Sequence, residues 1–149
     1  MVGDKGMFNA LTYKSILSFD TSQLPSGITI TSAELILRRK SLSGNINSIQ
    51  IDMRDGHFGS SNSLEQSDYY DPASAYNVTN LNIPSQDNTF ANTVLPASSF
   101  QYIKNGADHR TQFRLTASVS VPTFAANQMR FYSGVSETES NTARLVVRW

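Results

Sequence analysis

The stretch "ILSFDTSQLPSGITITSAELIL", residues 16–37, decides the fold. Its first part alternates apolar and polar side chains as far as Phe19, and alternation returns between Ala33 and Leu37. A period of two is typical of strands that bury one face. The intervening Asp-Thr-Ser and Pro-Ser-Gly favour turns, because their side chains bond nearby backbone groups or fix φ. We therefore expect a crossover between two strands, with Leu24 inserted into the core.

The same alternation recurs along the chain and helical periodicity is nearly absent. Further strands are expected around residues 49–53, 76–81, 112–119, 129–133 and 144–149, with short helical turns near 63–68 and 96–103. This spacing predicts a single all-β domain over residues 1–149, an antiparallel jelly-roll-like sandwich with one or two short helical turns. The expected core comprises Leu17, Phe19, Leu35, Leu37, Ile51, Phe113, Leu115, Phe131, Leu145 and Val147.

Composition excludes several classes of function. The formal net charge is zero, unlike the positive balance of proteins that bind nucleic acid. The chain has no cysteine, so disulfides and thiolate metal sites are absent. No apolar run approaches the length of a membrane span, and residues 1–6 lack the apolar region of a signal peptide.

Catalytic motifs are also missing. His57 and His109 lie in separate expected loops without zinc-site spacing, and the chain contains no nucleophile elbow and no phosphate-binding loop. We therefore expect a non-catalytic protein without a cofactor. Structural calcium is an alternative, because acidic residues in loops and at strand ends could supply oxygen ligands. The residues concerned are Asp52, Asp55, Asp68, Asp71 and Asp87, which are equally typical of turns.

One polar loop concentrates residues suited to sugar contacts. The segment "HFGSSNSLEQSDYYDPASAY", residues 57–76, carries a histidine and three tyrosines. Phe58 is expected to plug the core and Tyr69 to be half-buried. Tyr70 and His57 are left as candidate ligand-binding residues.

Basic residues follow the strands, whereas acidic residues gather in turns. Alternation places the basic residues at matching positions of the expected sheet. Their guanidinium groups could there pair with the carboxylates or sulfates of an acidic polysaccharide. The candidate ligand-binding residues are Arg38, Lys40, Arg114, Arg130, Arg144 and Arg148. The alternative is that these charges serve solubility and protect exposed strand edges from aggregation.

The opening stretch also carries a family pattern. The matching positions are Leu17, Phe19, Asp20, Ser22, Leu24, Pro25, Ile30, Ala33, Leu35 and Leu37, followed by segments 55–69, 100–115, 129–134 and 143–149. On these residues the chain resembles extracellular modules of the DNRLRE type, which are related to alginate-associated carbohydrate-binding modules. The resemblance implies an extracellular or cell-surface β-sandwich that binds polysaccharide or a cell-surface component.

A second function stays open beside this one. The resembled modules carry one or more strands before the point that matches Val2-Gly3-Asp4. The alternative is therefore a structural subunit of a fibre, sheath or particle, a homo-oligomer or filament assembled through strand complementation. In that case residues 1–8 would donate a strand to a neighbouring copy, with Val2, Met7 and Phe8 as the inserted side chains.

Overall fold

The computed structural model describes residues 1–6, 12–61, 63–104, 110–119, 124–134 and 138–149. The strands are β1 (Val2–Asp4), β2 (Thr12–Asp20), β3 (Ser32–Ser43), β4 (Ser48–Arg54), β5 (Ala75–Leu81), β6 (Phe90–Val94), β7 (Arg110–Ser118), β8 (Gln128–Phe131) and β9 (Arg144–Arg148). The 3₁₀ turns are η1 (Gln66–Tyr69), η2 (Ala97–Tyr102) and η3 (Glu139–Asn141). No helix within these ranges is long and apolar enough to cross a membrane.

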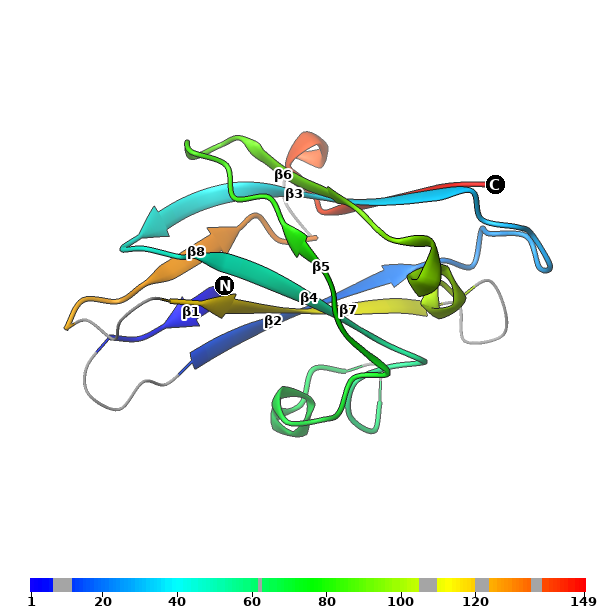
Figure 1. Ribbon diagram of the computed structural model, residues 1–149, viewed down its shortest axis with the longest axis horizontal. Helices are drawn as coiled ribbons and strands as arrows, with labels where there is room; N and C mark the ends of the chain where they lie inside the picture. Colours follow the sequence, from blue (N-terminus) through cyan, green and yellow to red (C-terminus); the bar gives the residue numbers. More distant parts are fainter. Residues whose placement is uncertain (7–11, 62, 105–109, 120–123, 135–137) are drawn as a thin grey trace.

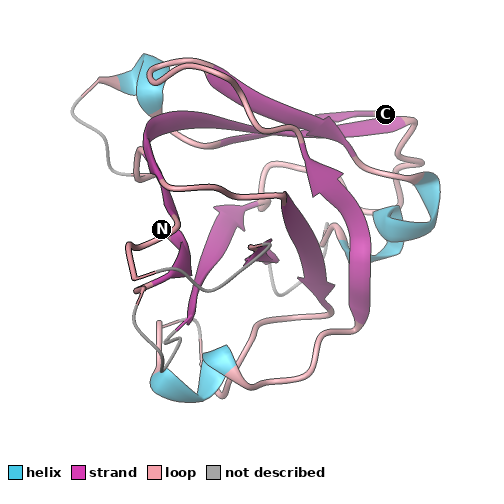
Figure 2. Ribbon diagram, turned by 60° about the vertical axis from the view of Figure 1, so that its left-hand side comes forward, coloured by secondary structure: helices cyan, strands magenta, loops and turns pink. Residues whose placement is uncertain are grey.

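The strands form one antiparallel sheet that curls into two layers (Figures 1 and 2). Hydrogen bonding follows the order β5-β4-β7-β2-β1-β8-β3-β6. β9 pairs with residues 32–36 of β3, on the edge of β3 opposite β6, and therefore continues the line of β8. One layer thus contains β5, β4, β7 and β2, and the other contains β6, β3, β8 and β9. The prediction of an all-β antiparallel fold is confirmed.

Alternation accounts for the core between the layers. Leu35 and Leu37 of β3 face Ile51, Phe113 and Leu115 from the opposite layer, and none of these side chains is more than 1% exposed. The other five predicted core residues pack against this cluster but are only partly buried: Leu17, Phe19, Phe131, Leu145 and Val147.

The stretch at 16–37 forms the predicted crossover. β2 ends at Asp20 in one layer and β3 begins at Ser32 in the other. Asp20 Oδ1 accepts a hydrogen bond from the Ser22 N–H (3.0 Å), which closes a turn directly after the strand. Leu24 packs against the core from this connection. Its sequence therefore fixes where the chain changes layer.

The alternation analysis did not predict β6. In this strand the small or polar Ala91 and Thr93 face inward, whereas the larger Phe90 and Val94 are 45% and 67% exposed. Thr93 is satisfied inside because its hydroxyl donates to the Asn80 carbonyl (3.0 Å) where β6 approaches β5. The inward face is therefore less apolar than the outward face, and the usual signal of a buried strand is reversed.

β1 corrects the expectation that the first residues are free to be donated. Gly3 pairs with Tyr13 of β2 and with Gln128 of β8, so β1 lies between two strands of its own chain (Figure 1). Val2 is fully buried in the core. The proposed insertion of Val2 into a neighbouring copy is wrong for this arrangement, and Met7 and Phe8 lie outside the described residues.

The tight packing of β1 generates a stability prediction. Gly3 has φ +123°, and a Cβ at this residue would lie 1.9 Å from the Asn127 carbonyl oxygen. Gly27 also has positive φ (+74°), but a Cβ there would have no neighbour within 4 Å. Gly27→Ala should cost about 1–2 kcal/mol of unfolding free energy through backbone strain alone. Gly3→Ala should cost about 1–3 kcal/mol more, because Asn127 and its neighbours must move.

Urea denaturation of the two variants measures this difference. Equal losses in the two variants would contradict the position of β1 between β2 and β8.

Candidate functional site

Five of the six predicted basic residues lie on the outer side of the β6-β3-β8/β9 layer. The register places Arg38 beside Phe90, and Ile36 beside Arg144. Because paired residues of antiparallel strands share a face, these side chains point outward together. We call this surface the basic face; its residues are Arg38, Lys40, Phe90, Arg130, Tyr132, Arg144 and Arg148.

Two aromatic rings occupy the centre of the basic face. The guanidinium groups of Arg38 and Arg144 lie 5.5 and 5.4 Å from the centroid of the Phe90 ring. The Tyr132 ring lies 5.7 Å from the Lys40 ammonium and 5.9 Å from the Arg38 guanidinium. Cations at this distance are attracted to the ring faces and hold the side chains together. The surface therefore combines exposed aromatic area with several cations.

The cations of the basic face are not neutralised within the described part of the chain. Ion pairs there involve Arg39, Arg54, Lys104 and Arg114, and none of the cations of the basic face. Arg38 donates to neutral acceptors, the Asn88 carbonyl and the Asn141 side-chain oxygen. A local excess of positive charge therefore exists although the whole chain has no net charge.

Arg114, the sixth predicted basic residue, does not lie on the basic face, so this prediction is wrong. Its side chain is buried and pairs with Asp52 of β4, with Nη2 3.1 Å from Oδ2, so it cannot contact a polymer on the surface. The guanidinium also lies 4.5 Å from the centroid of the Phe58 ring. Arg114 does point away from the core, as alternation predicts, but the connection between β4 and β5 folds over it.

Hydrogen bonds to buried polar groups fix that connection, residues 55–74. Arg114 donates to the carbonyl of Asp68, and the Phe58 N–H donates to Gln112 Oε1 (2.9 Å). Phe58 is 1% exposed, which confirms the prediction that it plugs the interior. The connection consequently covers the outer side of β7 and β4 around Arg114, where Asp52 and Gln112 are also buried.

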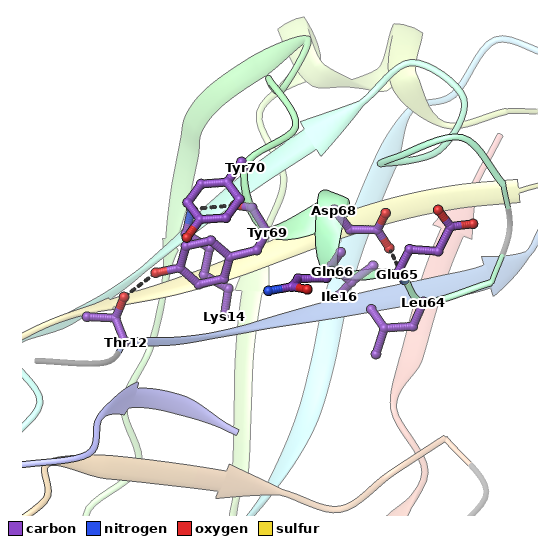
Figure 3. A pocket seen from close by; sticks show the side chains of 9 residues that line it. All are labelled: Thr12, Lys14, Ile16, Leu64, Glu65, Gln66, Asp68, Tyr69 and Tyr70. Atoms are coloured by element: carbon purple, nitrogen blue, oxygen red, sulfur yellow. Dashed lines mark hydrogen bonds between the residues drawn. The ribbon is translucent and has the colours of Figure 1, made fainter.

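A groove opens where this connection meets β2, on the layer opposite the basic face (Figure 3). Its volume is about 690 Å³, and we call it the tyrosine groove; its lining residues are Thr12, Lys14, Ile16, Leu64, Glu65, Gln66, Asp68, Tyr69 and Tyr70. Tyr69 and Tyr70 meet edge to face, with ring centroids 4.7 Å apart. The Lys14 ammonium lies 4.2 Å from the Tyr69 ring centroid and donates to the Tyr69 carbonyl.

The tyrosine groove combines strongly exposed apolar side chains with charged and hydroxyl-bearing ones. Tyr70 and Leu64 are 79% and 80% exposed, whereas Tyr69 is half-buried as predicted. Hydrogen bonds from Ser61 and Ser60 lower the pKa of the Glu65 carboxyl, so this group stays charged to a lower pH than an ordinary glutamate. An exposed ring beside charged and hydroxyl groups suits contact with one sugar unit.

The remaining candidates are dispersed. His57 is half-buried in the β4–β5 connection and does not line the tyrosine groove with Tyr70, and His109 lies outside the described residues. The acidic residues considered for calcium have basic or backbone partners: Asp52 pairs with Arg114, Asp71 with Arg54, Asp87 with Arg39, Asp55 with Lys104, and Asp68 accepts from the Glu65 N–H. In the described ranges, no group of three or more His, Asp or Glu side chains is placed to hold a metal ion.

Sequence reasoning missed Phe90 and Tyr132 of the basic face, and Lys14 and Leu64 of the tyrosine groove. Phe90 belongs to the strand whose alternation is reversed, and Tyr132 directly follows the end of β8. Cations at alternate strand positions gave the signal for the basic face, and the aromatic-rich loop at 57–76 gave the signal for Tyr70 of the groove. The pairing that brings Phe90 beside Arg38 depends on strand order, which alternation does not encode.

The buried position of Arg114 yields a test. Arg114→Ala should lower the free energy of unfolding by about 3–5 kcal/mol, because Asp52 is left as a buried, unpaired carboxylate. Arg130→Ala removes the same charge from an exposed position and should change stability by less than about 0.5 kcal/mol. Chemical denaturation of both variants gives the comparison. An Arg114→Ala variant as stable as Arg130→Ala would contradict the buried ion pair.

No family model, curated protein or solved structure matches this chain. A function must therefore be inferred from the chemistry of the two surfaces described above.

Proposed function

We propose that the protein is a non-catalytic β-sandwich module that binds anionic polysaccharide through the basic face. The observation that carries the proposal is the exposed Phe90 ring flanked by the guanidinium groups of Arg38 and Arg144. An aromatic ring offers a platform for the apolar face of a sugar ring, and the adjacent guanidinium groups offer bidentate donors to its carboxylate or sulfate groups.

The charge distribution supports an acidic ligand. Ser32–Arg38 of β3 pairs with β6 and β9, and the outward positions of these three fully described strands contain one acidic residue, Glu34. Glu34 Oε1 accepts a hydrogen bond from Asn92, 3.0 Å away. A polyanion would meet several cations and one carboxylate on this face. An exposed strand face suits an extended polymer rather than a small molecule, which would be enclosed more fully.

The proposal includes an extracellular or cell-surface location, where such polysaccharides are found. The resemblance on Leu17, Phe19, Asp20, Leu24 and Pro25 to extracellular modules supports it. A surface that recognises repeated acidic sugars would attach a larger assembly to a matrix or to a cell envelope.

Binding to polyuronate tests the proposal. The Arg38→Ala, Arg144→Ala double variant should bind alginate at least about tenfold more weakly than the parent chain, since each hydrogen bond to a charged group contributes roughly 1.5–3 kcal/mol. Affinity should also fall as salt rises, because the Debye length is only about 10 Å at 0.1 M. Isothermal titration calorimetry at two salt concentrations measures both effects.

A matched control separates specific binding from loss of net charge. The Lys5→Ala, Arg110→Ala double variant removes the same two charges from outside the basic face and should retain the parent affinity. If both double variants lose the same affinity for alginate, the loss reflects net charge alone, and the basic face is refuted as the binding surface. Neutral dextran should not compete.

The tyrosine groove is a smaller sugar contact that the same measurements can isolate. Tyr70→Ala removes the most exposed ring of the groove, on the layer opposite the basic face. We expect this variant to keep its salt-dependent affinity for polyuronate and to lose the weak binding of short neutral oligosaccharides. Chemical-shift perturbation measures the binding of these oligosaccharides. Loss of polyuronate binding in Tyr70→Ala would place the main site in the groove instead.

A further inference from the structure

Glu34 lies on the outward side of β3, between the two exposed arginines of β9. In the register of β3 with its neighbours, Glu34 pairs with Val146 of β9 on one side and with Val94 of β6 on the other. Arg144 and Arg148 are two residues before and two residues after Val146, on the same side of β9. Residues in this diagonal relation lie about 7–8 Å apart, within reach of long side chains. Either arginine could therefore reach the Glu34 carboxylate.

The Glu34 carboxylate pairs with neither arginine. None of the ion pairs among the described residues involves Glu34. Its Oε1 instead accepts a hydrogen bond from Asn92 Nδ2 of β6, 3.0 Å away. Because β6 and β9 lie on opposite edges of this part of β3, the hydrogen bond holds the carboxylate on the side away from the arginines. Arg144 and Arg148 therefore keep their charges for a ligand although a carboxylate lies between them.

The outward side chains along β9 thus present a cation, a row without a cation, and a second cation. Arg144 and Arg148 are four residues apart, a distance of about 13 Å along a strand. Between them lies the row formed by Val94, Glu34 and Val146, which we call the Glu34 row. Val94 is 67% exposed, so the row offers an apolar surface beside its carboxylate.

A polysaccharide with a carboxylate on every unit fits this order of charges poorly. A unit above the Glu34 row brings its own carboxylate close to that of Glu34, and like charges brought together repel. An uncharged sugar unit avoids this repulsion. Its hydroxyl groups can donate to the Glu34 carboxylate, which accepts several hydrogen bonds, and its C–H groups can contact Val94.

We infer that Glu34 is a specificity-determining residue of the basic face, and that the preferred ligand is a polysaccharide in which uncharged sugar units separate the acidic ones. The inference rests on the polysaccharide-binding function proposed above and adds to it the order of charges in the ligand. Arg144 and Arg148 bind acidic groups on either side of the Glu34 row. Asn92 is a positioning residue, because it acts by keeping the Glu34 carboxylate away from these arginines.

Titration calorimetry with two polymers tests the order of charges. Hyaluronan fragments alternate a uronate with an uncharged N-acetylated sugar, whereas alginate fragments of equal length carry a carboxylate on every unit. The parent chain should bind hyaluronan at least about threefold more tightly than alginate. General electrostatic attraction would favour alginate, which has twice as many carboxylates, so it predicts the opposite order. A parent chain that prefers alginate would overturn the inference.

Glu34→Gln tests the specificity-determining residue. The variant removes the charge but keeps the length of the side chain and an oxygen that can accept from Asn92. Alginate affinity should rise about fivefold because the repulsion is lost. Hyaluronan affinity should not rise, because its hydroxyl groups lose a charged acceptor.

A matched control removes one negative charge elsewhere. Asp55 directly follows β4 on the opposite layer, and its side chain is 59% exposed. Asp55→Asn should change the affinity for either polymer by less than about twofold, since exposed charges at a distance are screened by salt. If Asp55→Asn and Glu34→Gln raise alginate affinity equally, the effect comes from net charge and Glu34 has no special role.

Asn92→Ala tests the position of the carboxylate. The variant keeps the main-chain carbonyl that accepts from Asn82, but it frees Glu34 to pair with Arg144 or Arg148. Affinity for both polymers should fall about threefold, because one cation is neutralised. In a Glu34→Gln background, Asn92→Ala should have no effect on affinity. An equal loss in both backgrounds would show that Asn92 is merely structural and would overturn its assignment as a positioning residue.

The Arg38→Ala, Arg144→Ala double variant separates failure of this inference from failure of the proposed function. If the double variant binds both polymers as tightly as the parent chain, the basic face is not the polysaccharide site and the proposed function fails. If the double variant loses both polymers but Glu34→Gln leaves the ratio of the two affinities unchanged, the proposed function stands and the inference about Glu34 is wrong. Loss of both polymers in the double variant, together with a changed ratio in Glu34→Gln, supports both.

Discussion

Hydrogen bonds between Asp4 and Asn127 fix β1 at the place where the two layers of the sheet join. The Asp4 N–H donates to the Asn127 carbonyl (2.8 Å), and Asn127 Nδ2 donates back to the Asp4 carboxylate (3.2 Å). Both side chains are buried, so these bonds form where water cannot replace them. Asn127 Oδ1 also accepts from the Asn45 N–H (2.9 Å), which ties the β3–β4 turn to the same pair. β1 is only three residues long, and this network explains how so short a strand keeps its place.

The charged side chains of the protein fall into two groups that differ in solvation. Arg114, Arg39 and Arg54 pair with carboxylates or carbonyls that tie loops to strands. Arg130, Arg144 and Arg148 stand exposed on the β8–β9 line without an ion pair among the described residues. A buried cation must have a partner because desolvation is costly, whereas an exposed one keeps its hydration and can exchange it for a ligand. The second group is therefore the one suited to binding.

The two sides of β9 carry different chemistry. Arg144 and Arg148 point outward beside Phe90 and Ser32, whereas Leu145 and Val147 point inward toward Phe19 and Leu24. Alternation therefore allows one five-residue strand to present cations to solvent and to pack apolar side chains against the core.

The sequence by itself determined the elements whose inward residues are apolar at every second position. It placed β2, β3, β4, β5, β7, β8 and β9, the crossover at 20–31, and the inward packing of Phe58. It could not reveal β6, where Ala91 and Thr93 face inward, nor β1, whose three residues are too few for any period. Only the tertiary structure decided which outward faces meet water. Arg114 and Arg144 have the same alternation phase, but residues 55–74 cover Arg114 and no described segment covers Arg144. The physical reason is that a period of two fixes the direction of a side chain relative to its own strand, while strand order and loop paths, set by contacts distant in sequence, fix what lies above it.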